Sequence, residues 1–358
     1  MSKTLSIALI GPGLVGSEFL AQVQHYQQRQ GKLLSLNIVG IATSKRQILS
    51  AALPLATWKQ ELESKGVASD LDALAEHCIK HSPCVIVDST SNASVASKYT
   101  QWLKMGINVV TPNKKAFSAD LASYHALVDA SRNGTAVVYH ESTVGAGLPL
   151  LSTLNDLVET GDEIIKIEGI FSGTLSYIFN QFSSLSNSQS ASFSAVVATA
   201  KRLGYTEPDP RDDLNGMDVA RKVVILGRLA GLSLSLDTLS VENIVPQPLQ
   251  QVESADAFMS RLPEFDAHFE ALNKEALESG SVLRYVGVVD AKKPEASSVK
   301  LVRYDASHPF ASLKGSDNIV AFTTKRFPNP LIIQGAGAGA AVTAFGMFSD
   351  ILKVSKSI

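Results

Sequence analysis

The residue types best suited to chemistry gather between Lys201 and Lys222, where the chain reads KRLGYTEPDPRDDLNGMDVARK. Only 18% of the whole chain is charged, yet this run carries ten charged side chains in 22 positions. Two prolines in its first half exclude a helix interior there, whereas residues 216–229 have the apolar spacing of a helix. On that helix Asp218 and Lys222 are four residues apart and share a face. A carboxylate beside an ammonium on a mostly apolar helix could hold a small zwitterion and move one proton.

The same spacing has an ordinary alternative. Most acid–lysine pairs four residues apart on a helix are solvated and contribute a few tenths of a kcal/mol. The pair therefore indicates a site only in combination with the motifs and elements around it.

A glycine motif near the start of the chain, Gly11-Pro-Gly-Leu-Val-Gly16, lies between a predicted strand at 5–10 and a predicted helix at about 15–28. In this strand–turn–helix context Gly11 permits the tight turn, Gly13 lets the backbone approach a pyrophosphate, and Gly16 allows close helix packing. The N–H groups at the helix N-terminus would then face the phosphates. The motif predicts a binding site for NAD or NADP.

The end of the next strand bears on the choice between these cofactors. A site selective for NAD usually has an Asp or Glu about 20 residues after the glycines, bound to the ribose 2′-OH. No acidic residue occurs between Glu18 and Glu61, and the strand predicted at 36–42 runs into Thr43-Ser-Lys-Arg46. A basic pair there could accept a 2′-phosphate, and an ordinary solvated loop is the alternative. We expect NADPH to be used at least as well as NADH.

Polar residues follow two further predicted strands. Asp88-Ser-Thr-Ser-Asn92 comes after a buried strand at 84–88, and Thr111-Pro-Asn-Lys-Lys115 comes after the next strand. Ligands bind at the carboxyl ends of the strands in such sheets, so the hydroxyls of the first segment and the lysines of the second are candidate contacts. Capping of the following helix by Ser91 or Asn92 is an alternative role for the first segment, and both roles can hold at once.

Two glycine-rich segments have less specific chemistry. In His140-Glu-Ser-Thr-Val-Gly-Ala-Gly-Leu148, one carboxylate with turn carbonyls suits a hard cation held by oxygens, and a glycine hinge between domains is an equal alternative. His140 has no second ligand at metal spacing, so zinc is not predicted. The segment Gln334–Ala340 could approach the cofactor closely or let a helix pack on a sheet.

The order of the elements predicts the fold class. The first 140 residues alternate strand and helix signals, which predicts an α/β unit with a Rossmann-like, doubly wound parallel sheet. The later part alternates irregularly, which predicts an α+β domain. We expect a dinucleotide-binding domain at 1–147, to which a C-terminal helix at about 335–358 returns, and a substrate-binding domain at 148–334. The serine-rich segment 183–194 is predicted to be a surface loop.

Composition excludes several function classes. The chain has 358 residues, 45% hydrophobic content and a net charge of −2, which suits two cores and gives no indication of a nucleic-acid or membrane partner. No apolar run approaches the roughly 20 residues that span a bilayer, and Leu5–Ile10 enters a glycine turn, as a strand does and a signal peptide does not. Cys78 and Cys84 lack metal spacing and fit a reducing compartment. We expect a cytoplasmic protein with a small-molecule substrate.

Together these residues resemble homoserine dehydrogenases, specifically the fungal monofunctional form. The resemblance covers essentially the whole chain, through GPGLVG, TPNKKAF, YHESTVGAGLP, IEGIFSGTLSYIFN, LGYTEPDPRDDLNGMDVARK and QGAGAGAAVTAFG. The stretch from Glu168 to Lys222 is highly specific, whereas the first glycine motif is widespread. The resemblance implies reversible NAD(P)-dependent reduction of L-aspartate 4-semialdehyde to L-homoserine, on the route to threonine and methionine. It also implies a homodimer formed through the second domain.

The resemblance also implies roles for individual residues. Lys222 is the implied proton donor, Asp218 its partner at the substrate hydroxyl, and Lys114 a second lysine near cofactor and substrate. Implied substrate contacts are Glu207, at the substrate ammonium, with Asp218 and Thr174. Implied cofactor contacts are Gly11, Gly13, Leu14, Val15, Gly16, Thr90, Ser91, Lys114, Gly204 and Gly339. An alkali cation such as Na⁺ is implied at the Glu141 side chain and the carbonyls of Val144, Ala146 and Leu148.

Two other functions remain as alternatives. One is an amino-acid dehydrogenase on a related scaffold that acts on a different aldehyde or imine. The other is a nonenzymatic nicotinamide sensor, against which the charged run argues, because a sensor needs no proton donor. An aspartate-semialdehyde dehydrogenase would need a cysteine nucleophile, and Cys78 and Cys84 lie before or inside a predicted strand, away from any loop at a carboxyl end.

Overall fold

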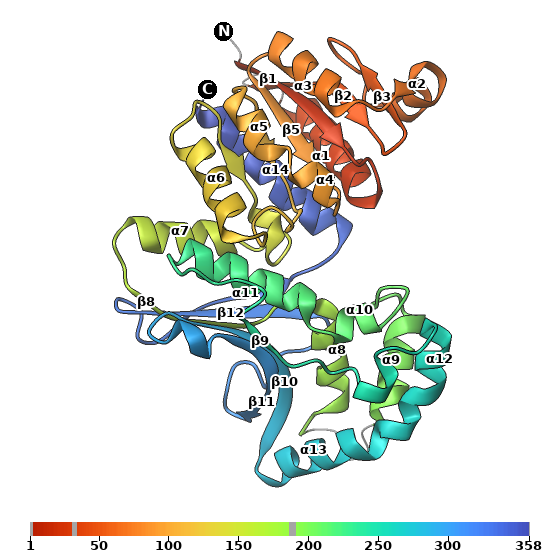
Figure 1. The fold of residues 1–358 in the computed structure, drawn as a ribbon, viewed down its shortest axis with the longest axis vertical. Helices are drawn as coiled ribbons and strands as arrows, with labels where there is room; N and C mark the ends of the chain where they lie inside the picture. The colour runs from red at the N-terminus through yellow and green to blue at the C-terminus, as the bar shows by residue number, and fades with distance from the viewer. Residues whose placement is uncertain (1–2, 31–33, 186–190, 358) are drawn as a thin grey trace. The chain divides into compact units, whose positions relative to one another are not determined.

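The computed structural model describes residues 3–30, 34–185 and 191–357, and the chain divides into two compact units (Figure 1). The first unit comprises Met1–Pro149 and Gly339–Ile358, and the second comprises Leu150–Ala338. Residues 186–190 of the serine-rich segment, which the sequence predicts to be a surface loop, lie outside the described residues.

The sheet of the first unit is mainly parallel, which confirms the predicted fold class. Its strand order in the described residues is β4-β3-β2-β1-β5-β6-β7. The strands are β1 (Lys3–Ile10), β2 (Leu34–Ala42), β3 (Arg46–Leu49), β4 (Val67–Ala68), β5 (Cys84–Asp88), β6 (Asn108–Val110) and β7 (Val138–Tyr139). Parallel pairing runs from β2 through β1, β5 and β6 to β7. The strand order changes direction between β1 and β5, which is the switch point at which open α/β sheets bind ligands.

One edge of this sheet differs from the sequence expectation. β3 pairs antiparallel with β2, and β4 pairs antiparallel with β3. The segment Thr43–Arg46, for which the sequence leaves a 2′-phosphate contact and a solvated loop as alternatives, is the turn of a β-hairpin. Thr43 Oγ1 accepts from Arg46 N at 2.9 Å and thereby closes the turn.

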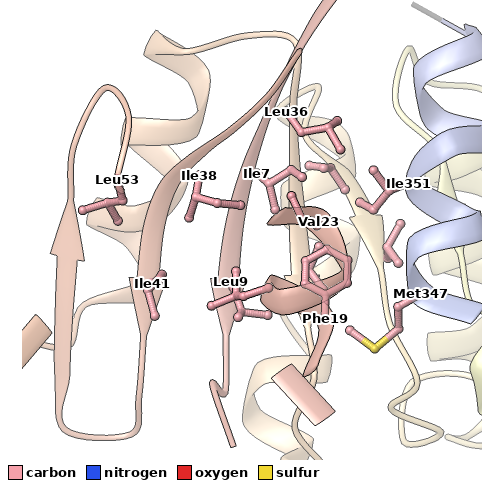
Figure 2. Close-up of a cluster of buried hydrophobic side chains, with 14 of the residues drawn as sticks. Ile7, Leu9, Phe19, Val23, Leu36, Ile38, Ile41, Leu53, Met347 and Ile351 are labelled. Carbon is pink, nitrogen blue, oxygen red and sulfur yellow. The ribbon is translucent and has the colours of Figure 1, made fainter. Parts of the chain in front are cut away.

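Helices cover the first sheet and complete its core. They are α1 (Leu14–Gln30), α2 (Trp58–Lys65), α3 (Leu71–Lys80), α4 (Ala93–Ala96), α5 (Tyr99–Lys104), α6 (Leu121–Arg132) and α14 (Ala340–Ser357). Figure 2 shows Ile7 and Leu9 of β1 facing Phe19 and Val23 of α1, with Met347 and Ile351 of α14 beside them. All six side chains are fully buried. The last helix of the chain thus shares its core with the first strand and the first helix.

The second unit is built on a mainly antiparallel sheet with the order β13-β12-β8-β10-β11-β9 among the described residues. The strands are β8 (Ile164–Ile170), β9 (Ser240–Val241), β10 (Ser281–Asp290), β11 (Ser298–Asp305), β12 (Asp317–Thr324) and β13 (Leu331–Ala336). The helices are α7 (Leu150–Glu159), α8 (Gly173–Phe182), α9 (Phe193–Arg202), α10 (Arg211–Leu214), α11 (Met217–Leu229), α12 (Ala255–Arg261) and α13 (Asp266–Glu278). α11 packs on β10 and β11, and α8 packs on β10 and β12 (Figure 1).

α11 is the helix that the sequence predicts at 216–229. Most of its apolar residues, among them Val219, Val223 and Leu226, are buried, whereas Met217 at its start is exposed. Lys222 lies among them and is also buried, with 7% of the residue exposed. The sequence pattern predicted the helix, and the packing of this helix on the sheet takes its lysine out of water.

Candidate active site

Lys222 is held by two oxygens in the second unit. Its ammonium Nζ lies 2.7 Å from Asp218 Oδ2 and donates to the carbonyl oxygen of Phe171 at 2.7 Å. The lysine side chain is 9% exposed, whereas that of Asp218 is 49% exposed. The ordinary alternative of a fully solvated ion pair is therefore wrong for the lysine. A buried amine with an exposed carboxylate at its side can transfer a proton at the surface of the unit.

A second group of polar residues lies around Asp213, in α10. The hydroxyl of Thr174, in the first turn of α8, lies 2.9 Å from Asp213 Oδ1 and 2.5 Å from the carbonyl oxygen of Tyr205. The backbone N–H of Glu207 donates to Asp213 Oδ2 at 2.8 Å. Asp213 thus ties the turn that carries Glu207 to the start of α8.

Electrostatics in this group favour a cation. Burial raises the pKa of Asp213 above its usual 3.8, and the negative charges of Glu207 and Asp218 raise it further. Glu207 itself is exposed. The carboxyl groups of Asp213, Glu207 and Asp218 interact electrostatically. Together they create a negative potential that would attract the ammonium of an amino acid. Sequence reasoning missed Asp213, although its place in the PDPRDD run was a visible signal.

The glycine motif of the first unit has the close contacts that a dinucleotide turn needs. Gly11 has φ +84°, and a Cβ there would lie 2.6 Å from Thr90 Cγ2. A Cβ on Gly16 would lie 2.4 Å from the carbonyl oxygen of Gly11. In the described part of the chain, no atom comes within 4 Å of a Cβ placed on Gly13. The backbone at Gly13 is therefore open to a ligand, directly before α1 begins at Leu14.

A buried network joins the polar segments after β5 and β6. Asp88 Oδ2 accepts from the Tyr99 hydroxyl and from Asn113 Nδ2, the latter at 3.0 Å, and Asp88 Oδ1 accepts from Thr90 N at 2.8 Å. Asp88 is fully buried, and burial raises the pKa of its carboxyl group. The Asn113 side chain in turn accepts from Lys115 N at 3.1 Å. One carboxylate therefore shapes both the loop of Thr90 and the turn that contains Lys114.

The segment 88–92 also caps a helix, which is the alternative role that the sequence left open for Ser91 or Asn92. The capping residue of α4 is Asn92, whose side chain accepts from Ser94 N and Val95 N. Ser91 is exposed and precedes the cap. The cap belongs to Asn92, so Ser91 stays a candidate cofactor contact.

The loop after β7 packs against α14. Glu141 is 5% exposed, and its Oε2 lies 3.2 Å from Lys353 Nζ, which also lies 2.8 Å from Asp350 Oδ1. Asp350 Oδ2 accepts from Glu141 N at 2.9 Å, and burial raises the pKa of Asp350 to about 6. Gly145 and Ala146 both have positive φ, +74° and +53°, so the backbone reverses sharply beside this carboxylate.

The fit of this loop to a cation is partial. Glu141 supplies one buried carboxylate, and the sharp turn presents backbone carbonyls, which are ligands that an alkali cation accepts. Lys353 already places an ammonium beside the same carboxylate. Among the described residues, no group of three or more His, Cys, Asp or Glu side chains could hold a metal ion.

The predicted site residues divide between the two units. The first unit holds the glycine turn, Thr90, Ser91, Lys114, the Glu141 loop and Gly339, and the second holds Thr174, Gly204, Glu207, Asp218 and Lys222. Within the second unit, Glu207 and Thr174 meet at Asp213, and Lys222 meets Asp218.

In the described ranges, none of the helices has the length and apolar character needed to span a membrane.

A parallel α/β unit with a dinucleotide turn, joined to a unit with a buried lysine beside an exposed aspartate, defines a nicotinamide-dependent oxidoreductase. The family model of homoserine dehydrogenase matches residues 149–352, and that of the homoserine dehydrogenase NAD-binding domain matches residues 11–141. The chain belongs to the homoserine dehydrogenase family, which confirms the resemblance and shows an enzyme that uses NAD(P).

Relatives of known name agree over the full length. Homoserine dehydrogenase of Saccharomyces cerevisiae is 48% identical over 100% of this chain and 99% of its own, and that of Schizosaccharomyces pombe is 46% identical over 99% and 96%. The bifunctional aspartokinase/homoserine dehydrogenase 1 of Arabidopsis thaliana is 48% identical, but the match covers 98% of this chain and only 39% of that protein.

Solved structures agree on the fold. A Candida auris protein of unknown function has a TM-score of 0.93 at 46% identity, with 99% of each chain covered. A hyperthermophilic archaeal homoserine dehydrogenase in complex with NADPH has a TM-score of 0.74 at 23% identity, with 100% of this chain and 99% of that chain covered. At that identity the second likeness supports the fold alone.

Proposed function

We propose that this protein catalyses the reversible NAD(P)H-dependent reduction of L-aspartate 4-semialdehyde to L-homoserine, in threonine and methionine biosynthesis. The observation that carries the proposal is the buried Lys222 ammonium, held 2.7 Å from Asp218 on a helix of a family-matched chain. The family match favours this reaction over another amino-acid dehydrogenase, and it excludes a nonenzymatic sensor.

Lys222 is the proposed proton-transfer group. The nicotinamide, when bound, supplies the hydride that reduces the aldehyde carbon. Lys222 gives its proton to the aldehyde oxygen, where negative charge develops, and in the reverse direction its free amine takes the hydroxyl proton of homoserine. Asp218 stabilises the charged lysine and accepts a hydrogen bond from the substrate hydroxyl.

The substrate is proposed to bind at the acidic group of the second unit. Glu207, exposed beside Asp213, binds the substrate ammonium, and Thr174 lies at the same place. Lys114, in the turn shaped by Asn113, is a second lysine near cofactor and substrate. The negative potential of this group supports a substrate that carries an ammonium.

The first unit is proposed to be the dinucleotide-binding domain and the second the substrate-binding domain. The residues that would hold the cofactor are Gly11, Gly13, Leu14, Val15, Gly16, Thr90, Ser91, Lys114, Gly204 and Gly339. The open backbone at Gly13 and the α1 N-terminus support binding of the pyrophosphate.

NADPH is proposed to be used at least as well as NADH. Lys45 and Arg46 are exposed in the hairpin turn that follows β2, where a 2′-phosphate could be accepted. The test compares kcat/KM for the two cofactors. An advantage of NADH above about tenfold, or 1.4 kcal/mol, would contradict this proposal.

A monovalent cation such as Na⁺ is proposed at Glu141 and the carbonyls of Val144, Ala146 and Leu148. The buried carboxylate and the sharp turn at Gly145 and Ala146 support it. Thermal unfolding in NaCl against choline chloride tests it, with Glu141→Gln as the control. A Na⁺-specific stabilisation that is absent from Glu141→Gln is expected, and equal curves in both salts would contradict the site.

A cytoplasmic homodimer, paired through the second unit, is proposed from the family resemblance. Analytical ultracentrifugation and fluorescence microscopy of a tagged chain test these two points. A monomer at micromolar concentration would contradict the first, and fluorescence confined to an organelle would contradict the second.

The central experiment is the kinetics of Lys222→Ala. We expect kcat to fall far more than KM changes, and we expect wild-type oxidation of homoserine to rise with pH well above neutrality. If kcat is unchanged, the role belongs to Lys114 or to water. A panel of other amino alcohols with NADP⁺ separates this activity from that of a related dehydrogenase.

A further inference from the structure

Asn318 is a buried polar residue that the proposed reaction does not use, although it touches the Lys222 site. It lies near the start of β12, beside the end of β8. Its Nδ2 donates at 3.0 Å to the carbonyl oxygen of Phe171, and this is the same oxygen that accepts from Lys222 Nζ at 2.7 Å. One backbone carbonyl therefore holds both the lysine and the asparagine.

The other polar atom of the Asn318 side chain is its oxygen, Oδ1. Asn318 is 0% exposed, and its Oδ1 is buried without a hydrogen-bond partner in the described part of the protein. A buried, unpartnered oxygen costs free energy that an apolar side chain of similar shape would avoid. The feature that distinguishes Asn318 is the partner of its Nδ2, because that carbonyl oxygen also accepts from Lys222.

Gly337, in the second glycine motif, makes room for this side chain. A Cβ on Gly337 would lie 2.0 Å from Asn318 Nδ2 and 2.7 Å from Asn318 Cβ. Any other residue at 337 would displace the asparagine amide. This contact gives part of the motif a packing role that the sequence left open.

We propose that Asn318 is a positioning residue for Lys222, acting through the carbonyl oxygen of Phe171, and that Gly337 is a glycine because Asn318 must occupy its place. This inference rests on the proposed role of Lys222. The Nδ2 group fixes the direction of the carbonyl and, by donating to it, moderates its strength as an acceptor for the ammonium. Without that donor, the carbonyl stabilises the charged lysine more strongly, and the lysine orientation is less well fixed.

The test compares three variants of the full chain with wild type: Asn318→Ala, Gly337→Ala and the double variant. The readouts are kcat, KM and the pH profile of homoserine oxidation. Asn318→Ala should lower kcat between about 10- and 100-fold with little change in KM. It should also move the alkaline rise upward by about 0.5 pH unit or more. Gly337→Ala should do the same, and the double variant should be no worse than Asn318→Ala, because both act through one contact.

Asn273 offers a matched control. It is 4% exposed, its Nδ2 donates to the carbonyl oxygen of Phe182 at 2.9 Å, and its Oδ1 is also buried without a partner among the described residues. Asn273→Ala should lose thermal stability as Asn318→Ala does, yet keep the wild-type pH profile. If Asn318→Ala does not fold, Asn318→Leu keeps a similar branched shape, removes the donor without adding a charge and should shift the profile in the same direction.

Two results would overturn the inference: an Asn318→Ala profile that matches that of Asn273→Ala, or additive losses in the double variant. Lys222→Ala, measured in parallel, distinguishes a failure of the proposed role of Lys222 from a failure of the positioning role of Asn318. If Lys222→Ala keeps its kcat, the proposed role of the lysine fails. If Lys222→Ala is inactive while Asn318→Ala keeps both its kcat and its wild-type profile, only the positioning role fails.

Discussion

Replacing Asp88 by Asn tests whether one buried carboxylate organises the cofactor side of the first unit. Its Oδ2 accepts from the Tyr99 hydroxyl and Asn113 Nδ2, and its Oδ1 accepts from Thr90 N. An amide has only one oxygen, so in either orientation an NH₂ group faces one of these donors. The less costly orientation keeps the oxygen toward Tyr99 and Asn113 and sets the NH₂ against Thr90 N.

The expected magnitude follows from that single mismatch. One lost hydrogen bond with a buried, unsatisfied donor costs about 1–3 kcal/mol. For a unit of this size, each kcal/mol lowers Tm by about 2–4 °C, so a loss near the middle of the range gives about 4–8 °C. Because Thr90 loses its anchor, we expect Kd for NADPH to rise about tenfold, which corresponds to 1.4 kcal/mol. This orientation keeps the contact with Asn113 that shapes the turn of Lys114, and Lys222 and Asp218 belong to the second unit, so kcat at saturating cofactor should change little.

Thermal unfolding and NADPH fluorescence titration measure the two effects. Tyr99→Phe is the matched control, because it removes one donor from Oδ2 and leaves the contacts of Asn113 and Thr90 in place. It should cost about 1 kcal/mol and change Kd less. Asp88→Asn with wild-type Tm and Kd would refute the reasoning, and so would a Tyr99→Phe variant equal to it in both.

Three further predictions concern single residues. Thr174→Val removes the hydroxyl at Asp213 and should raise KM for homoserine more than it lowers kcat in steady-state assays, whereas an unchanged KM would remove Thr174 from the site. Burial raises the pKa of Asp350 from 3.8 to about 6, so the folded state keeps a proton that the unfolded state has released. The free energy of unfolding that Asp350 contributes should therefore fall by up to about 3 kcal/mol as the pH rises from 4 to 6. Urea unfolding of the wild type should show this dependence on pH, and that of Asp350→Asn should not. Arg284 is 2% exposed and donates only to backbone carbonyls among the described residues. Arg284→Met should therefore lower the free energy of unfolding in urea by about 3 kcal/mol, whereas the exposed Arg303→Met should lower it by less than about 1 kcal/mol. Equal losses in the two variants would contradict the argument from burial.

The long, periodic elements could be predicted from the sequence. The strand predicted at 84–88 is β5 with the same bounds, and the helix predicted at 216–229 is α11 from Met217. The strand is a nearly continuous apolar run, and the helix has apolar residues at helical spacing. In both, the buried side chains reinforce the pattern. The hairpin strands β3 and β4 have four and two residues, which is too short for a period to appear. Their pairing depends on the neighbouring β2 edge, and a sequence pattern does not contain that edge.

The site could be predicted only in part, for a similar reason. Spacing placed Asp218 and Lys222 on one face, but burial of the lysine depends on how α11 packs on the sheet. Asp213 and Asn318 form hydrogen bonds with residues 39 and 147 positions away, respectively. Such contacts arise from the fold, so residue type and local spacing could not identify Asn318, and they marked Asp213 only as one acid of the PDPRDD run.

The unequal burial of Lys222 and Asp218 distinguishes this pair from an ordinary solvated pair and supports the proposed proton transfer. Burial disfavours the charged lysine, whereas the aspartate and the Phe171 carbonyl favour it. The reversible reduction that we propose uses the charged and the neutral form of this amine in its two directions. An arginine at 222 could satisfy the same two oxygens but would not release its proton. In the reaction we propose, this position calls for a lysine because the reaction runs in both directions, and the proposed role of Asn318 is to influence that proton transfer through the Phe171 carbonyl.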